Sequence, residues 1–157
     1  MSDSDWFKGS GEPILFSDLL KEAEQYVEKG GKIFIGTDSQ LGLDSCVFVT
    51  AVCLHGKPMS KGGRYFFKKT KTTAGMFRTL KVRIMHEVQN SIEIALHMIE
   101  KSPRTSVEIH LDIGTTEKSK TRSYVDELKG WTQSIGFACK VKPNAWASAS
   151  VADKHTK

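Results

Sequence analysis

The chain has 157 residues, of which 39% are hydrophobic and 26% charged, and its formal net charge is +5. This composition excludes a disordered chain, and the length suits a single domain with a sizeable core. No apolar run approaches the roughly 20 residues that a membrane helix needs, and three scattered cysteines form no zinc motif or disulfide framework. The polar, acidic N-terminus lacks the order of a signal peptide. We therefore expect a cytoplasmic protein.

The first half of the chain predicts a loose arm, one helix and three strands. Residues 1–15 form the expected arm. A helix follows, starting at Ser17 or Asp18 and ending at Lys29, just before a pair of glycines. Apolar and β-branched runs predict strands at residues 32–37, 46–55 and 64–70. Because short turns join them, these strands should form an antiparallel meander.

The second half predicts alternating helices and strands. Helices are expected at residues 75–101 and 123–135, strands at 106–113 and 137–141, and a short helix within the tail, 145–157. The long helix forces a crossover, which should be right-handed and return the fourth strand parallel to the first. The fold class is therefore α/β. We expect one domain over residues 1–157, with a mixed five-stranded sheet, helices on both faces and an extra N-terminal helix.

Two of the predicted strands deliver an aspartate at the same end. The stretch KIFIGTDSQ, residues 32–40, ends its apolar run just before Asp38, and VEIHLDIG, residues 107–114, repeats the pattern with Asp112. If the two strands are central neighbours, their carboxylates lie side by side. An aspartate in an ordinary turn is the alternative explanation for each residue taken alone.

Two further acidic residues can join this pair. Glu87 lies at the edge of the inner face of the long helix, whereas Glu93 lies on its solvent side. Asp153 lies in the tail. Together with Asp38 and Asp112 they form a candidate carboxylate cluster, and clustered carboxylates repel one another unless cations occupy the site. Oxygen-only ligands favour Mg²⁺ or Mn²⁺. Two such ions, bridged by Asp38, could activate a water and stabilise the leaving oxygen of a phosphodiester.

The cations of the chain are unevenly distributed. Residues 45–86 contain nine Lys or Arg and no Asp or Glu, whereas residues 1–44 carry nine acidic and four basic residues. An acid-free stretch of this kind suggests a surface that faces a polyanion, although a solvated basic face is the alternative. A second basic group follows the fourth strand and could bind phosphate, with a solvated loop as the alternative. The candidate nucleic-acid-binding residues are Lys68, Lys69, Lys71, Arg78, Lys81 and Arg83, and then Lys118, Lys120 and Arg122.

Three segments carry a resemblance to a known family. GTDSQ at 36–40, LDIGTTEKSKTR at 111–122 and AWASASVADKHTK at 145–157 resemble the YkuK-like family of predicted ribonuclease H-like proteins. The similarity covers nearly the whole chain after about residue 12, and the predicted order of elements agrees with it. It implies a ribonuclease H-like fold and a Mg²⁺-dependent nuclease. By position, the resemblance assigns the carboxylates of that fold to Asp38, Glu87, Asp112 and Asp153.

Three functions remain open at this point. The first is a metal-dependent nuclease, a hydrolase acting on RNA, DNA or an RNA/DNA hybrid. The second is a non-catalytic nucleic-acid-binding module of the same fold. The third is a phosphotransferase or phosphatase that uses the same carboxylates, although the phosphate-binding pattern GxxxxGK[ST] is absent from the sequence. The expected partner is nucleic acid, and no membrane partner is expected.

Overall fold

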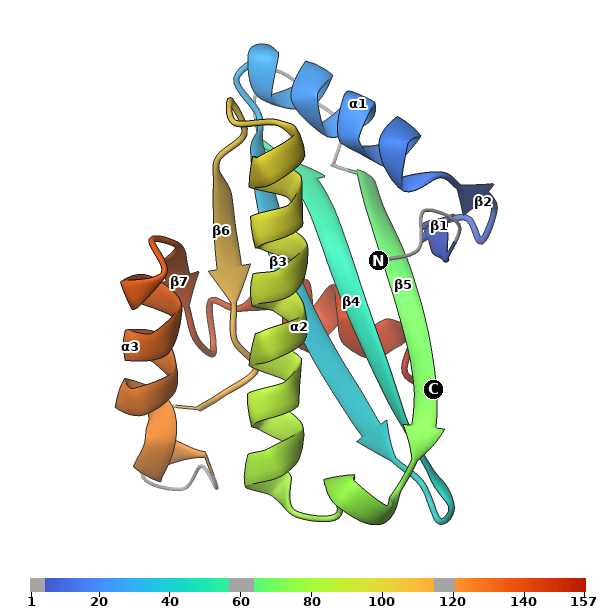
Figure 1. The fold of residues 1–157 in the computed structure, drawn as a ribbon, viewed down its shortest axis with the longest axis vertical. Helices are drawn as coiled ribbons and strands as arrows, with labels where there is room; N and C mark the ends of the chain where they lie inside the picture. Colours follow the sequence, from blue (N-terminus) through green and yellow to red (C-terminus); the bar gives the residue numbers. More distant parts are fainter. Residues whose placement is uncertain (1–4, 57–63, 115–120) are drawn as a thin grey trace.

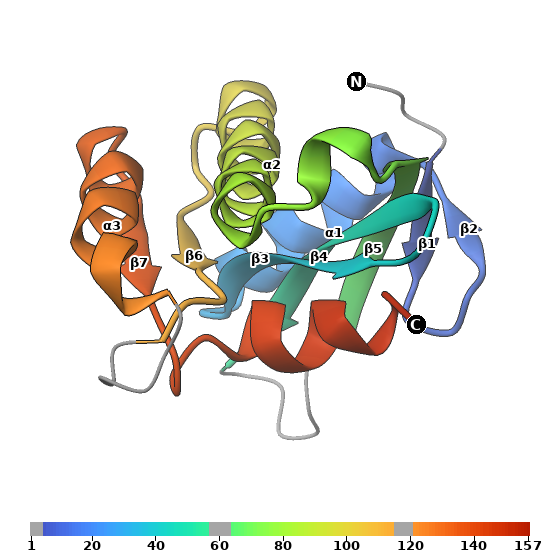
Figure 2. The same ribbon diagram turned by 90° about the horizontal axis from the view of Figure 1, so that it is seen from below.

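The computed structural model describes residues 5–56, 64–114 and 121–157. Over these residues the chain forms one mixed sheet with the strand order β2-β1-β5-β4-β3-β6-β7. Helices α1, α2 and α3 cover one face of the sheet, and the C-terminal helical segment covers the other (Figures 1 and 2). No helix among the described residues is long and apolar enough to cross a membrane.

The three-stranded meander and the parallel fourth strand are formed as predicted. β3 (Lys32–Leu41), β4 (Ser45–His55) and β5 (Arg64–Thr73) form the antiparallel meander. β6 (Val107–His110) pairs with β3 in parallel, and β7 (Ala138–Lys140) pairs with β6 in parallel. The crossover through the long helix therefore returns the chain beside the first strand of the meander, as the sequence predicts.

Three α-helices pack on one face of this sheet. They are α1 (Phe16–Glu28), α2 (Leu80–Lys101) and α3 (Val125–Ser134). The long helix was expected from residue 75, but a short 3₁₀ turn, Gly75–Phe77, comes first. The main core lies between these helices and the sheet, where α1, α2 and the strand residues that face them bury their apolar side chains.

The N-terminal region corrects one expectation. Residues 1–15 were predicted to be a loose arm, yet β1 (Trp6–Lys8) and β2 (Pro13–Ile14) form a hairpin that extends the sheet from five strands to seven. Trp6 is fully buried, with its ring centroid 5.8 Å from that of Phe16. Burial of this large side chain stabilises the hairpin, which also covers the hydrogen-bonding edge of β5.

Two strand ends also differ from the prediction, and both differences shape the site. β3 does not end at residue 37 but continues to Leu41, because β4 supplies a backbone partner at every step. β6 ends at His110, three residues earlier than predicted, and pairs with β3 only from Ile33 to Gly36. Figure 1 shows β3 running past the end of β6. Beyond Gly36, β3 therefore has no strand partner on that side among the described residues.

A π-helical segment, Ala147–Ala152, lies near the C-terminus, where a short helix was predicted. It packs against β3 and β4 on the face opposite α2 (Figure 2). Gly36 permits this approach, since a Cβ atom added there would lie 2.4 Å from the backbone nitrogen of Ser148. A residue with any side chain at position 36 would push the segment away from the sheet.

Candidate carboxylate site

Three acidic side chains meet beside the free stretch of β3. Asp38 lies on β3 just beyond the last residue that pairs with β6, and Asp112 lies two residues after β6 ends. Glu87 reaches the same point from α2. One carboxylate oxygen from each of the three lies within 4.8 Å of the others. The structure thus brings together the three carboxylates that the sequence placed on two neighbouring strands and a crossover helix.

A buried hydroxyl network fixes the position of Glu87. The Thr37 hydroxyl lies 2.7 Å from that of Ser91 on α2, and this contact joins the helix to β3. One turn earlier on α2, the Ser39 hydroxyl donates to Glu87 Oε2 at 2.5 Å. Glu87 is buried, whereas Glu93 is exposed. The helical phase in the structure is therefore the one that the sequence predicted.

Asp153 approaches from the other face of the sheet. Its backbone N–H donates to the Ser148 carbonyl at the end of the π-helical segment. Its carboxyl lies near that of Asp38, where it helps to raise the pKa of Asp38. The Thr156 hydroxyl donates to the Asp153 carbonyl oxygen at 2.8 Å, which secures the following turn. Asp153 is thus a fourth carboxylate beside the cluster of three, and it is more exposed than Asp38 or Glu87.

A histidine links the segment that carries Asp153 to β6. The backbone N–H of Ala147 donates to Nδ1 of His110 at 3.1 Å, so the ring proton lies on Nε2 and is donated to Glu108 at 2.9 Å. His110 is almost completely buried, and Trp146 packs on it with ring centroids 5.3 Å apart. Burial lowers the pKa of His110, which favours this neutral form.

The surroundings of Asp38 and Glu87 disfavour the ionised form of both carboxyl groups. Burial raises the pKa of Asp38 to about 9, helped by contact with Asp112 and Asp153 and by the nearby charge of Glu87. Burial also raises the pKa of Glu87 to about 8, although the hydrogen bond from Ser39 opposes the shift. Acids held together in this way need either protons or a cation.

One positive side chain already lies in the cluster. Lys142 Nζ is 2.9 Å from Asp112 Oδ1. Although burial opposes its charge, contact with Asp112 and the proximity of Asp38 and Glu87 raise the pKa of Lys142 above its ordinary value. Lys142 is not among the site residues predicted from the sequence. The strand topology could have indicated it: Lys142 follows β7, which is parallel to β6, so it lies at the same end of the sheet as Asp112.

The donor set fits a divalent metal ion. It consists of carboxylate oxygens, and hard oxygen ligands suit Mg²⁺, Mn²⁺ or Ca²⁺ better than softer metals. The raised pKa values of Asp38 and Glu87 indicate that neutralising charge would be bound favourably here. The cluster is therefore able to hold a metal ion by both its geometry and its electrostatics.

The predicted basic residues of β5 divide between two faces of the sheet. Asp38 pairs with Val49, and Val49 pairs with Lys69, so these three side chains lie in one row on the same face. Lys71 occupies the next row on that face, and both lysines are exposed. Lys68 points to the opposite face, where it lines a small hollow beside α2.

The remaining predicted cations have varied surroundings. The Arg83 guanidinium donates to the carbonyls of Phe77 and Arg78, and Arg78 donates to the Leu43 carbonyl, so both arginines brace the turn before α2. Lys81 lies 5.8 Å from the centre of the Tyr124 ring. Arg122 lies in a 3₁₀ turn before α3. Lys118 and Lys120 fall outside the described residues.

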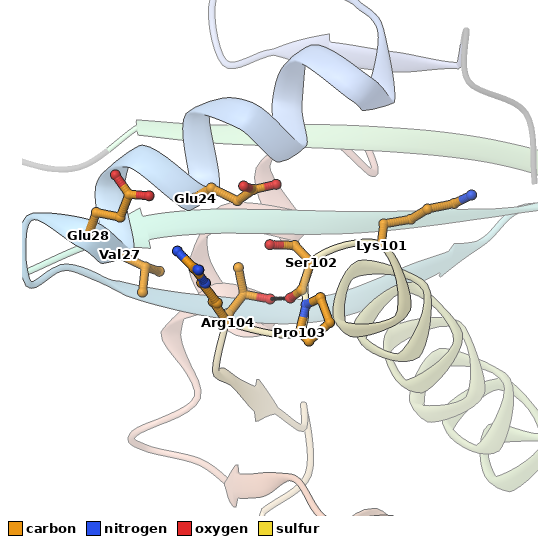
Figure 3. A pocket seen from close by; sticks show the side chains of 8 residues that line it. Glu24, Val27, Glu28, Lys101, Ser102, Pro103 and Arg104 are labelled. Atoms are coloured by element: carbon orange, nitrogen blue, oxygen red, sulfur yellow. Dashed lines mark hydrogen bonds between the residues drawn. The ribbon is translucent and has the colours of Figure 1, made fainter.

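A cavity of about 230 Å³ lies elsewhere in the molecule. Its walls are Glu24, Val27 and Glu28 of α1 on one side and the segment from Lys101 to Thr105 on the other (Figure 3). It borders the C-terminal end of α2, whereas Glu87 lies near the N-terminal end of that helix. This cavity and the carboxylate cluster are thus separate features.

Comparison with known proteins identifies relatives of the whole chain. A model of the family described as Ribonuclease H-like matches residues 15–157. The chain is also 29% identical to a Bacillus subtilis (strain 168) protein named "Uncharacterized protein YkuK", over the full length of both chains. The family match begins directly after the hairpin of β1 and β2, and it includes every carboxylate of the cluster.

Proposed function

We propose that this chain, which belongs to the ribonuclease H-like family, is a metal-dependent nuclease that hydrolyses phosphodiester bonds. The observation that carries the proposal is the convergence of Asp38, Glu87 and Asp112 at one point. Asp153 adds a fourth carboxylate from the opposite face. Members of one fold family can differ in activity, so these side chains support the proposal more strongly than the fold does.

The roles of the residues follow from their positions. Asp38 interacts with Glu87, Asp112 and Asp153, so it is the carboxylate that we expect to contribute to binding both ions. Bound Mg²⁺ or Mn²⁺ would lower the pKa of a water and neutralise the charge that develops on the phosphate. Ser39 orients Glu87, and the bond between Ala147 and His110 holds the segment that carries Asp153.

A polymeric substrate is favoured over a small phosphate ester. Lys69 and Lys71 are both exposed. Across the sheet, Lys69 lies in the same row of paired residues as Asp38, and Lys71 lies in the same row as Gln40. Neighbouring strands are about 4.8 Å apart, so Lys69 lies about 10 Å from Asp38 across two strand spacings. That separation suits phosphates further along a nucleic acid whose scissile phosphate lies at the carboxylates. RNA, DNA and their hybrid all present this backbone.

The test is cleavage of labelled single-stranded, duplex, hybrid and junction substrates with Mg²⁺, with Mn²⁺ and with a chelator. We expect at least one substrate to be cut only with metal, leaving 5′-phosphate ends. Asp38→Asn should cut none of them. Binding of several substrates without cleavage of any would instead favour a non-catalytic nucleic-acid-binding module, and turnover of a small phosphate ester alone would favour a phosphatase.

A further inference from the structure

Lys142 is placed beside the carboxylate cluster by the backbone as well as by its ion pair. The N–H of Lys142 donates to the Ile113 carbonyl at 3.0 Å, and the N–H of Leu111 donates to the Lys140 carbonyl at 2.8 Å. These bonds prolong the alignment of β6 and β7 past the ends of both strands. Because Asp112 lies between the two bonded residues, the alignment brings Lys142 next to it, with Nζ 2.9 Å from Oδ1.

We propose that Lys142 is a resident cation of the site, whose ammonium group takes the place beside Asp112 that a second metal ion would otherwise occupy. In the absence of nucleic acid the cluster then binds a single divalent ion tightly. The inference rests on the proposed function, because it assumes that the carboxylates hold a divalent cation.

The arrangement of charges supports this role. The ammonium group contacts Asp112, whose side chain is only 17% exposed, while the Lys142 side chain is 48% exposed. A long, flexible side chain that is half exposed to solvent can move away from its partner and still remain attached to the protein. A bound metal ion that moved away would dissociate. When a phosphate adds negative charge to the site, Lys142 can either move to that phosphate or leave Asp112 free for a second ion.

A resident cation predicts a specific effect on metal affinity. Removing a positive charge next to a cation site should strengthen binding of a divalent ion, since like charges repel. We expect Lys142→Met to bind Mn²⁺ about tenfold more tightly than the parent, or to bind two ions where the parent binds one, the effect being moderated by solvent around the side chain. Lys142→Arg keeps the charge and should behave as the parent does.

The experiment is calorimetric titration of the metal-free full chain with Mn²⁺, without nucleic acid. Lys140→Met is the matched control, because it removes one exposed lysine charge from the adjoining strand β7. Thermal unfolding in chelator gives a second readout. Lys142→Met should melt about 3 °C lower than the parent in chelator and recover in Mn²⁺, whereas Lys140→Met should change neither quantity.

The possible outcomes separate this inference from the nuclease proposal. Unchanged or weaker Mn²⁺ binding by Lys142→Met, or tighter binding by Lys142→Arg as well, would overturn the role of Lys142 and leave the nuclease proposal intact. Absence of Mn²⁺ binding in every variant would overturn both. Tighter binding by Lys142→Met alone supports the resident cation, whether or not any nucleic acid is cleaved.

Discussion

At the scale of single residues, Asp38 carries the largest conflict between stability and function. It is 7% exposed and shares its surroundings with Glu87, Asp112 and Asp153. A carboxylate in such a place destabilises the fold unless a cation accompanies it, and such conflicts are typical of functional sites. The consequence can be measured with one substitution.

Asp38→Asn should abolish cleavage and at the same time stabilise the metal-free protein. We expect the cleavage rate to fall by more than about 100-fold, because even residues that only orient metal ligands cost 10–100-fold when replaced. The free energy of unfolding in chelator at pH 8 should rise by about 1–3 kcal/mol. Denaturant titration measures the second effect. A variant that cleaves at the parent rate would rule out the proposed chemistry, and one that loses stability would contradict the charge argument.

The pH dependence of stability should have an unusual sign. Burial raises the pKa of Asp38 to about 9 in the folded protein, whereas in the unfolded chain Asp38 has the ordinary aspartate pKa of 3.8. Between these values the folded state binds more protons, so the free energy of unfolding falls as pH rises. Glu87, with a pKa of about 8, adds to the trend. Melting temperatures in chelator should therefore decline from pH 5 to pH 9.

Added Mg²⁺ provides the control for this titration. Metal that binds only the folded state should restore stability, and more so at high pH, where fewer protons compete for the carboxylates. Asp38→Asn should flatten the decline in chelator. A parent protein whose stability in chelator rises steadily up to pH 9 would show that these acids are not protonated in the folded state.

At the scale of secondary-structure elements, the alternation of β5 separates neighbouring lysines. Lys69 and Lys71 share the face of Asp38, and Lys68 lies on the face covered by α2. Replacing Lys69 and Lys71 by Gln should weaken binding to nucleic acid and reduce the salt dependence of log K by about 0.9 per lost contact on duplex DNA. Lys68→Gln is the matched control and should change the slope much less. Equal effects of all three would indicate non-specific attraction.

The contact between β3 and the π-helical segment gives a second prediction at this scale. Gly36→Ala should cost about 3 kcal/mol or more, because its Cβ would overlap Ser148 and Ala147 and nothing there can move cheaply. It should also reduce metal affinity, since the segment carries Asp153. Gly130→Ala on α3 is the control, as a Cβ there meets no atom within 4 Å. That variant should be as stable as the parent or about 0.5–1 kcal/mol more stable. Chemical denaturation and metal titration test both.

The elements also show what sequence patterns can and cannot predict here. The antiparallel meander, the parallel return of β6 beside β3 and the inward phase of Glu87 follow from hydrophobic periodicity and the rules of crossover connections, and the structure agrees with all three. The continuation of β3 through Asp38 could not be predicted, because backbone pairing with β4 holds polar residues in a strand whatever their side chains. Lys142 was missed because its contact with Asp112 depends on where two strands stop.

At the scale of the whole molecule, the N-terminal hairpin adds two strands to the sheet beside β5. This hairpin was missed because β1 and β2 are too short for a periodic signal. Trp6→Ala should lower the free energy of unfolding by about 3–5 kcal/mol, since a fully buried Trp is lost. Lys8→Ala on the same strand should change it by no more than about 0.5 kcal/mol. Equal melting temperatures for the two variants would mean that the hairpin contributes little.

The position of Asp153 in the chain has a consequence for biosynthesis. Asp38 is translated early, and its partners Glu87, Asp112 and Asp153 follow one after another, the last of them close to the end of the described chain. Translation adds about 5–20 residues per second, so a nascent chain spends several seconds with an incomplete set of carboxylates. If the chain is the nuclease proposed above, it cannot cut the message or the ribosomal RNA around it until all four carboxylates have been brought together by folding.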